Sequence, residues 1–463
     1  MLRRTFFLSF ILFLSLPDAA FAHGFGRSQD IPLPSWLYLF GINAVVIATF
    51  VMVALSFEER PRSGYPRRSL SPAVLTNGVF LSGVKLLSVG LFLLTILSGL
   101  FGDQETTANF APTFFWISWW VGLSFFTVFI GNIWPLVNPW KVVFEWVDDL
   151  ARRFGAKKGL SAGVRYPSRL GVWPAAALYA GFTWFEILFS GSSVPASIAA
   201  FLIVYSVITW SGMAVFGKEA WLKNGEAFSV FYGVLGRFSP TETRVNEEGR
   251  REINVRPPAA GLGVGGGASV SLMAFVVLML AGVTFDSLIE TPPWLAFQNA
   301  TSIPGAVGFA GLTVVFLLLY LGSIKLSQLS GGRIVSFRRL ASEYVYSLVP
   351  IAVAYFVAHY YSYFLVQGQR MIALVSDPLG WGWNLFGTAS YEARAGVIDA
   401  GFVWYSQVAL ILAGHIAAVW LAHKVALRLF GEPMKAAKSQ YPMLGLMVSY
   451  TVFSLWILTQ PIG

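Results

Sequence analysis

The chain of 463 residues contains no cysteine and only four histidines. Without cysteine it has no disulfide bridges, thiolate metal ligands or thiol nucleophiles. Charged residues are also scarce, at 12% of the chain, whereas hydrophobic residues make up 56%. A soluble domain with this composition would leave much apolar surface in contact with water. The composition therefore predicts a membrane protein.

Apolar runs recur from one end of the chain to the other. Each is about 20 residues long, enough for a helix to cross a hydrocarbon core of about 30 Å. We predict an all-α fold, a polytopic transmembrane helix bundle of about ten spans after a cleaved signal peptide. The predicted spans are Trp36–Ser56, Val79–Leu100, Pro112–Trp134, Gly171–Ser190, Pro195–Phe216, Val270–Leu288, Pro304–Leu326, Tyr344–Val366, Phe402–Val425 and Met443–Leu458.

The N-terminus has the three parts of a secretory signal peptide. Met1–Arg4 is basic, Thr5–Leu16 is apolar, and Ala20–Ala22 is a small-x-small cleavage site. Removal of residues 1–22 leaves His23 as the first residue, on the outer face of the membrane. A terminal histidine offers an imidazole and a free α-amine to one metal ion. The alternative is that cleavage beside a histidine is an accident of processing.

Lysine and arginine are concentrated in alternate connections between the predicted spans. The opposite connections carry only Arg27, Arg370 and Arg394. The positive-inside rule then places the basic connections in the cytoplasm and both mature termini outside. This distribution accounts for the net charge of +9 without a nucleic acid partner.

Two inner connections are longer than simple turns. Within the first, Val142–Val147 is apolar and charges follow it, which predicts a helix lying on the inner surface. The second, residues 240–268, is polar and then rich in proline and glycine, which predicts a cytoplasmic linker that is flexible. It separates an N-terminal transmembrane half, residues 23–239, from a C-terminal half, residues 269–463. The longest outer connection, 367–401, carries tryptophan and phenylalanine and is expected to fold onto the bundle.

Ionisable side chains inside membrane spans are costly, so each needs an explanation. Glu186, Asp286 and His359 fall in the outer half of their spans, beneath the face where His23 begins, and His415 lies deeper. Imidazole and carboxylate ligands without sulfur suit Zn, Mn, Co or Cu(II). We predict a divalent metal site formed by His23, Asp286, His359 and His415. Glu186 is a further ligand or the general base, and His359 shares the catalytic role.

A structural alternative remains open for these residues. Glu186 and Asp286 would then bond to tyrosine, tryptophan or backbone groups, and His359 would be a buried neutral imidazole with tyrosine partners. A bis-histidine haem is disfavoured because His359 and His415 differ in depth by roughly two helical turns. A Ser-His-Asp triad is not predicted, since the sequence has no Gly-x-Ser-x-Gly elbow. Tryptophans near Trp381 and Trp404 are a further candidate lining for an aromatic ligand.

Several stretches of the chain are distinctive as sequence motifs. They are His23–Arg27, Ile31–Pro34, Asn138–Trp140, His359–Tyr363, Gln367–Gln369, Ser376–Thr388, Gly414–His415 and Ala422–His423. Together they resemble the bacterial polytopic membrane proteins described as fenitrothion hydrolases. The resemblance covers most of the mature chain, and the outer connection is its most specific part. It implies an aryldialkylphosphatase-type activity in the bacterial inner membrane, but it carries over no catalytic residues.

The resemblance and the candidate metal site together predict a membrane-embedded hydrolase of organophosphorus triesters. A metal-bound hydroxide would attack the phosphorus of a small apolar aryl ester that partitions into the lipid bilayer. The main alternative is a multi-pass transporter or metal permease, which two helical halves and polar residues at depth would suit. A metal-handling protein that uses the terminal histidine, and a subunit of a larger membrane complex, are further alternatives.

Overall fold

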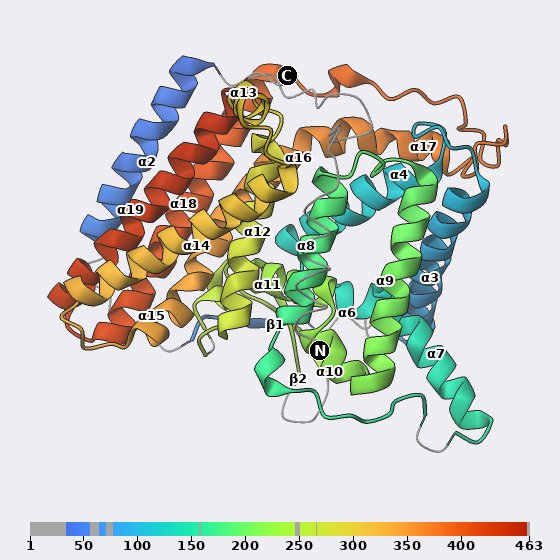
Figure 1. Cartoon of the computed structure of the whole chain (residues 1–463), viewed down its shortest axis with the longest axis horizontal. Coiled ribbons are helices and arrows are strands. Elements are labelled where there is room, and N and C mark those ends of the chain that lie inside the picture. The colour runs from blue at the N-terminus through green and yellow to red at the C-terminus, as the bar shows by residue number, and fades with distance from the viewer. Residues whose placement is uncertain are drawn as a thin grey trace.

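The computed structural model describes residues 34–55, 64–70, 77–156, 159–245, 251–264 and 266–460. The predicted signal peptide and His23 lie outside the described residues. The described residues are 74% helical, which confirms the mostly helical fold. Figure 1 shows two groups of helices side by side, joined through α8, α11, α12 and α16.

The first group comes from the N-terminal half and stands on the right of Figure 1. Aromatic rings fill the space between its helices; for example, Phe185 stacks on Phe201 with the ring centroids 4.6 Å apart. Its elements are α3 (Gly78–Phe101), α4 (Phe110–Pro112), the π-helix η3 (Thr113–Gly122), α5 (Leu123–Phe129), α6 (Trp134–Val137), α7 (Pro139–Arg153), η4 (Ser168–Leu170), α8 (Trp173–Ile187), α9 (Pro195–Phe216), α10 (Lys218–Asn224) and α11 (Ala227–Phe238).

The second group contains the C-terminal half together with α2 (Ser35–Leu55), and it stands on the left of Figure 1 except for the segment with α17, which extends across the top to the right. Its other elements are α12 (Val270–Leu288), α13 (Pro292–Thr301), α14 (Gly305–Ser330), α15 (Phe337–Tyr344), η6 (Val345–Leu348), α16 (Val349–Gln367), η7 (Gly368–Arg370), α17 (Met371–Leu374), η8 (Ala395–Val397), α18 (Ala400–Phe430) and α19 (Pro433–Leu458).

The position of α2 differs from the predicted division at residue 239. Helix α2 packs against α18 and α19, far along the sequence from its own half. The contact is close because Gly41 has no side chain, and a Cβ there would lie 3.2 Å from Leu455 Cδ1. At the N-terminal end of α2, the rings of Trp36 and Tyr405 lie 6.2 Å apart. The structural division therefore assigns α2 to the C-terminal group.

Within the described residues, eight helices are long and apolar enough to cross a membrane. The structure therefore supports a multi-pass membrane protein with about eight spans, where the sequence predicted ten. Two of the ten predicted spans are not among these eight helices. One is α2, in which Ser35–Thr49 forms a shorter apolar helix, and the other is α8. Helix α8 has 15 residues and a length of about 22 Å, because Pro174 lies in its first turn and a turn follows Leu188.

The predicted flexible linker contains ordered strands. β2 (Thr241–Val245) and β3 (Arg251–Val255) pair antiparallel, and β3 also pairs with β1 (Arg68–Leu70) in the order β1-β3-β2. Threonine, valine and isoleucine in these segments favour extended structure. The buried guanidinium of Arg256 then pairs with Glu242 at 2.8 Å, and η5 (Ala260–Leu262) follows. The two halves are thus connected by a small sheet.

The outer connection 367–401 folds onto the bundle, as predicted. It crosses the top of Figure 1, and its backbone bonds to the segment between α3 and α4. The N–H of Asp103 donates to Leu379 O at 2.8 Å, and that of Phe110 donates to Pro378 O at 3.1 Å. Trp381 and Trp383 are exposed. They contact each other edge to face and do not line either of the two described cavities.

Candidate acid–base site between the two halves

Helix α12 places Asp286 and Ser287 in the interior of the bundle. The helix begins at the capping hydroxyl of Ser269 and packs against α8, α14 and α16, so most of its residues are buried. Asp286 is 1% exposed and Ser287 is 8% exposed. A carboxyl group at such a position requires hydrogen-bond partners, because its transfer from water is costly.

Helix α16 supplies these partners from two consecutive residues. His359 Nε2 lies 3.1 Å from Asp286 Oδ2, and His359 Nδ1 lies 3.1 Å from Ser287 Oγ. The hydroxyl of Tyr360 donates a short hydrogen bond to the same oxygen of Asp286. The imidazole therefore lies between a hydroxyl and a carboxyl group, with a hydrogen-bonding nitrogen directed at each.

Helix α8 brings a second carboxyl group to the same place. Glu186 is buried, and its Oε1 lies 3.4 Å from the hydroxyl oxygen of Tyr360. A phenol has one proton, so Tyr360 cannot donate to Asp286 and Glu186 at the same time. When it donates to Asp286, a protonated Glu186 can donate to the phenol oxygen. Two carboxyl groups around one phenol are thus suited to share a proton.

A cavity of about 30 Å³ lies beside these groups. Glu186, Asp286 and Tyr360 line it together with Tyr179 and Thr183, and apolar side chains complete the wall. A polar cavity of this volume can hold one or two water molecules. The site therefore combines proton donors, proton acceptors and space for water.

The π-helix η3 forms part of the wall through Trp120, which is buried. Its ten residues make it long for this type of helix, since π-helical geometry usually covers a single turn. Such segments are frequent at functional sites. On the opposite side, η3 lines a second, larger cavity through Phe114, Phe115, Ser118 and Trp119.

The structure brings together three of the five predicted site residues, namely Glu186, Asp286 and His359. It places His415 in another interface, where Nε2 lies 2.6 Å from Thr49 Oγ1 and Nδ1 lies 3.0 Å from Thr451 Oγ1. These contacts join α18 to α2 and α19, so the imidazole of His415 does not contact Glu186 or Asp286. His23 lies outside the described residues.

Among the described residues, no group of three or more histidine, aspartate or glutamate side chains has a geometry that could hold a metal ion. His359 and Asp286 are bonded to each other, so a metal would have to replace that contact. The predicted set also needs His23, so the metal site stays a prediction. The tyrosine contact expected under the structural alternative is present, through Tyr360.

Two buried polar residues were not singled out from the sequence, Ser287 within the site and Glu226 outside it, in the first group of helices. Ser287 directly follows Asp286, but a serine in an apolar run carries no distinctive signal. Glu226 is fully buried and caps α11, with Tyr205 donating to it at 2.5 Å. Its position before the apolar run that begins at Ala227 is a capping signal that was available in the sequence.

Comparison of the chain with protein-family models, with curated proteins and with solved structures finds no match. The family indicated by the resemblance therefore stays a prediction. The fold and the composition identify the chain as a polytopic membrane protein with eight candidate spans in the described residues.

Proposed function

We propose that the chain is a membrane-embedded hydrolase in which Ser287 is the nucleophile and His359 the general base. One observation carries this proposal: the imidazole of His359 lies 3.1 Å from the hydroxyl of Ser287 and 3.1 Å from the carboxyl group of Asp286. The order hydroxyl, imidazole, carboxylate is that of a catalytic triad, with the two ring nitrogens exchanged relative to serine proteases.

The proposed reaction starts when His359 Nδ1 takes the proton of Ser287 and the serine oxygen bonds to phosphorus. Asp286 stabilises the resulting imidazolium through its contact with Nε2. The phosphorus–aryloxy bond breaks with its electron pair going to the aryl oxide, and the imidazolium gives its proton to this leaving group, which restores neutral His359. Water then attacks the phosphoryl-serine while His359 takes its proton. The phosphorus–serine bond breaks, and the proton returns to the serine oxygen. Trp120 and Thr183, which line the cavity, carry donors suited to a phosphoryl oxygen.

The proposed substrate class is a neutral, apolar aryl ester of phosphorus, as the resemblance implies. Such molecules partition into the bilayer, which surrounds the bundle. The cavity beside Asp286 has room for water but not for a triester, so binding requires neighbouring side chains to move. A nitrophenolate leaving group needs little acid assistance, and the shared proton near Glu186 is available for poorer ones.

The test is release of a nitrophenol from a phosphorothioate triester by purified protein in detergent. We expect Ser287→Ala to lower kcat by about 10³-fold or more, as for other nucleophiles of this type. Ser362→Ala is the matched control, because Ser362 is also 8% exposed and lies on α16. A fluorophosphonate should label the peptide containing Ser287 and fail to label the variant. Full activity of Ser287→Ala would refute the nucleophilic role.

A second candidate is a proton-coupled transporter, favoured by where the site lies. Glu186 belongs to the N-terminal group of helices, whereas Asp286, His359 and Tyr360 belong to the C-terminal group. Transporters commonly bind substrate and coupling ions between two such halves. Proteoliposomes with pyranine inside test it: uptake of Zn²⁺ or Mn²⁺ coupled to proton movement and abolished by Glu186→Gln, without nitrophenol release, would favour transport.

A further inference from the structure

Three lysines from three different helices surround one carboxylate at one end of the N-terminal group. The ammonium groups of Lys218, Lys85 and Lys141 lie 2.8, 3.4 and 3.9 Å from the nearest oxygen of Glu145. All four side chains are partly buried and partly accessible. Lys218 also lies 3.5 Å from Glu219, but that side chain is 87% exposed, and solvent screens its charge.

The lysines outnumber the negative charge that faces them. Burial lowers the pKa of Lys141, and the positive charges of Lys218 and Lys85 act in the same direction, while Glu145 opposes them. Burial disfavours ionisation of Glu145, but its bond to Lys218 and the charges of all three lysines outweigh burial and lower its pKa. The carboxylate is therefore ionised, and the cluster still has an excess of positive charge. An anion at this position would balance it.

A large apolar cavity begins beside Lys85 and Lys141. Its volume is about 330 Å³, and it is lined by α3, α5, α6, η3 and the first residues of α7. Ser88 lines it and lies three residues after Lys85 on the same face of α3, and Trp140, which directly precedes Lys141 on α7, lines it as well. Along α3 the lining continues from Val84 to Thr95, about 16 Å into the bundle.

The cavity is suited to a hydrocarbon chain and opens to the surface. The hydroxyls of Ser88 and Thr95 both donate to backbone carbonyls, so they are satisfied within the protein. Leu87 lines the cavity and is 62% exposed. Because α3 is one of the least buried of the candidate spans, this opening faces the lipid of the bilayer.

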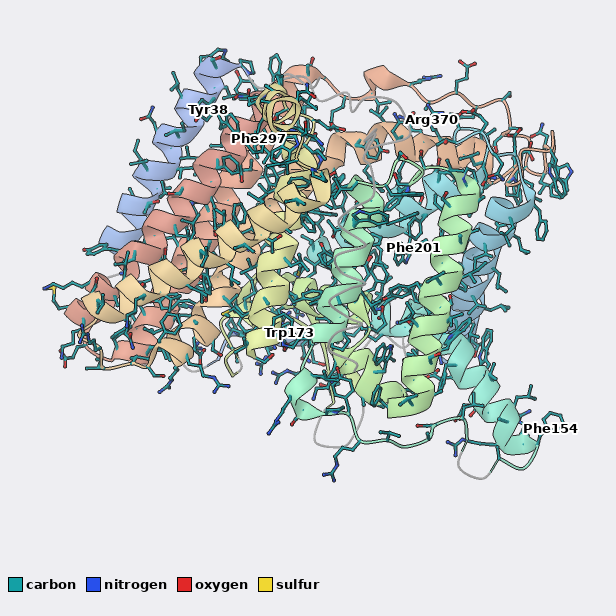
Figure 2. All side chains as sticks on the ribbon, viewed as in Figure 1. Tyr38, Phe154, Trp173, Phe201, Phe297 and Arg370 are labelled. Atoms are coloured by element: carbon teal, nitrogen blue, oxygen red, sulfur yellow. The ribbon has the colours of Figure 1, made fainter. Side chains whose placement is uncertain are left out.

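Helix α7 has a second apolar surface beside the cluster. Trp146, Val147, Leu150 and Phe154 are exposed and lie on one face of the helix. Figure 1 shows α7 extending outward from the bundle, and Figure 2 places Phe154 at its far end, where it is 85% exposed. An amphipathic helix of this kind rests in the headgroup region with its apolar face in the acyl chains. The lysine cluster then lies at headgroup depth.

We propose that Lys85, Lys141 and Lys218 bind the headgroup of an anionic phospholipid, one acyl chain of which occupies the apolar cavity along α3. The ammonium groups donate to the phosphodiester oxygens, which compete with the carboxylate of Glu145 for these donors. The apolar cavity beside the cluster distinguishes a lipid from free phosphate, which would leave the cavity unfilled. This site is separate from Ser287 and does not depend on the proposed hydrolase activity.

The test measures lipid binding to the delipidated full-length protein by native mass spectrometry and thermal stability in detergent. Dioleoyl phosphatidylglycerol should bind and raise the melting temperature. Dioleoyl phosphatidylcholine should bind at least about tenfold more weakly, since each lysine near a membrane surface contributes appreciably to anion affinity. Inorganic phosphate should neither bind nor compete, and added salt should weaken phosphatidylglycerol binding. Equal binding of the two lipids, or full competition by phosphate, would overturn the proposal.

Variants distinguish the contribution of the lipid headgroup from that of the acyl chain. Lys85→Gln with Lys218→Gln should weaken phosphatidylglycerol binding about tenfold, whereas Lys223→Gln on the exposed side of α10 should leave it unchanged. Leu91→Trp fills the cavity and should also weaken binding, whereas Leu93→Trp, exposed on the same helix, should not. Unchanged binding in both test variants contradicts the site. If the double variant does not fold, the comparisons of the two lipids and of low and high salt on the unaltered protein test the proposal.

Discussion

Replacement of Glu226 by alanine tests whether a buried carboxyl group organises the first group of helices. Glu226 is 0% exposed and accepts hydrogen bonds from five donors contributed by several segments. Oε1 accepts from Phe228 N at 2.9 Å and Tyr205 Oη at 2.5 Å, and Oε2 accepts from Ser229 N at 2.7 Å, Trp134 Nε1 at 3.3 Å and Asn138 Nδ2 at 3.4 Å.

Glu226→Ala leaves these donors without their acceptor and removes the cap of α11. An unsatisfied buried donor costs about 1–3 kcal/mol, but some of these donors will find new partners. We therefore expect the free energy of unfolding to fall by about 3–5 kcal/mol. Glu226→Gln should destabilise the protein nearly as much, because each carboxyl oxygen accepts from at least two donors. In either orientation of the glutamine amide, its NH₂ group would face donors instead of acceptors.

The assay is thermal unfolding of the purified protein in detergent, monitored by circular dichroism. Glu219→Gln is the control, because the Glu219 side chain is 87% exposed on the neighbouring helix α10 and should leave the midpoint unchanged. A Glu226→Gln midpoint equal to that of the unaltered protein would show that these donors do not require a carboxylate, and the reasoning would fail.

Three further outcomes are expected. Gly414→Ala should destabilise the protein by about 1–3 kcal/mol, because its Cβ would lie 2.3 Å from that of Ala354, whereas Gly445→Ala, with no neighbour within 4 Å, should not. The pKa of Asp148 is lowered by the N–H of Leu160 and by Arg152, so its stabilising contribution is complete above its ordinary value of 3.8 and is lost as the pH falls through the lower value. Hydrogen exchange of the Leu160 amide should report this, and Asp148→Asn should abolish the change. Nitrophenol release should survive chelation; a loss restored by Zn²⁺ would favour the metal site that the sequence predicts.

The sequence predicted the membrane class and most of the spans because long apolar runs have one stable conformation in lipid. It also predicted that Glu186, Asp286 and His359 share a level of the bundle, since depth follows from counting residues along each span. Rotation of each helix about its axis does not follow from counting. The separation of His415 from His359 depends on that rotation, and so does the contact between Ser287 and the imidazole.

Segments whose conformation depends on distant partners were harder to predict. Residues 241–255 look like a linker in isolation, and their strands form only because β3 pairs with β1 as well as with β2. Similarly, the cluster around Glu145 joins lysines from α3, α7 and α10. Each of these lysines, taken alone along the sequence, is an ordinary basic residue near the end of an apolar run.

The packing of α2 against α18 and α19 has a consequence for biogenesis. Helix α2, near the start of the chain, meets these neighbours only after nearly the whole polypeptide has been translated, because α18 and α19 are close to its end. During that interval Gly41 and Thr49 face lipid or the insertion machinery instead of another helix. Final assembly must therefore close the beginning of the chain onto its end, and nascent chains stalled before α18 should expose α2 to proteolysis or crosslinking.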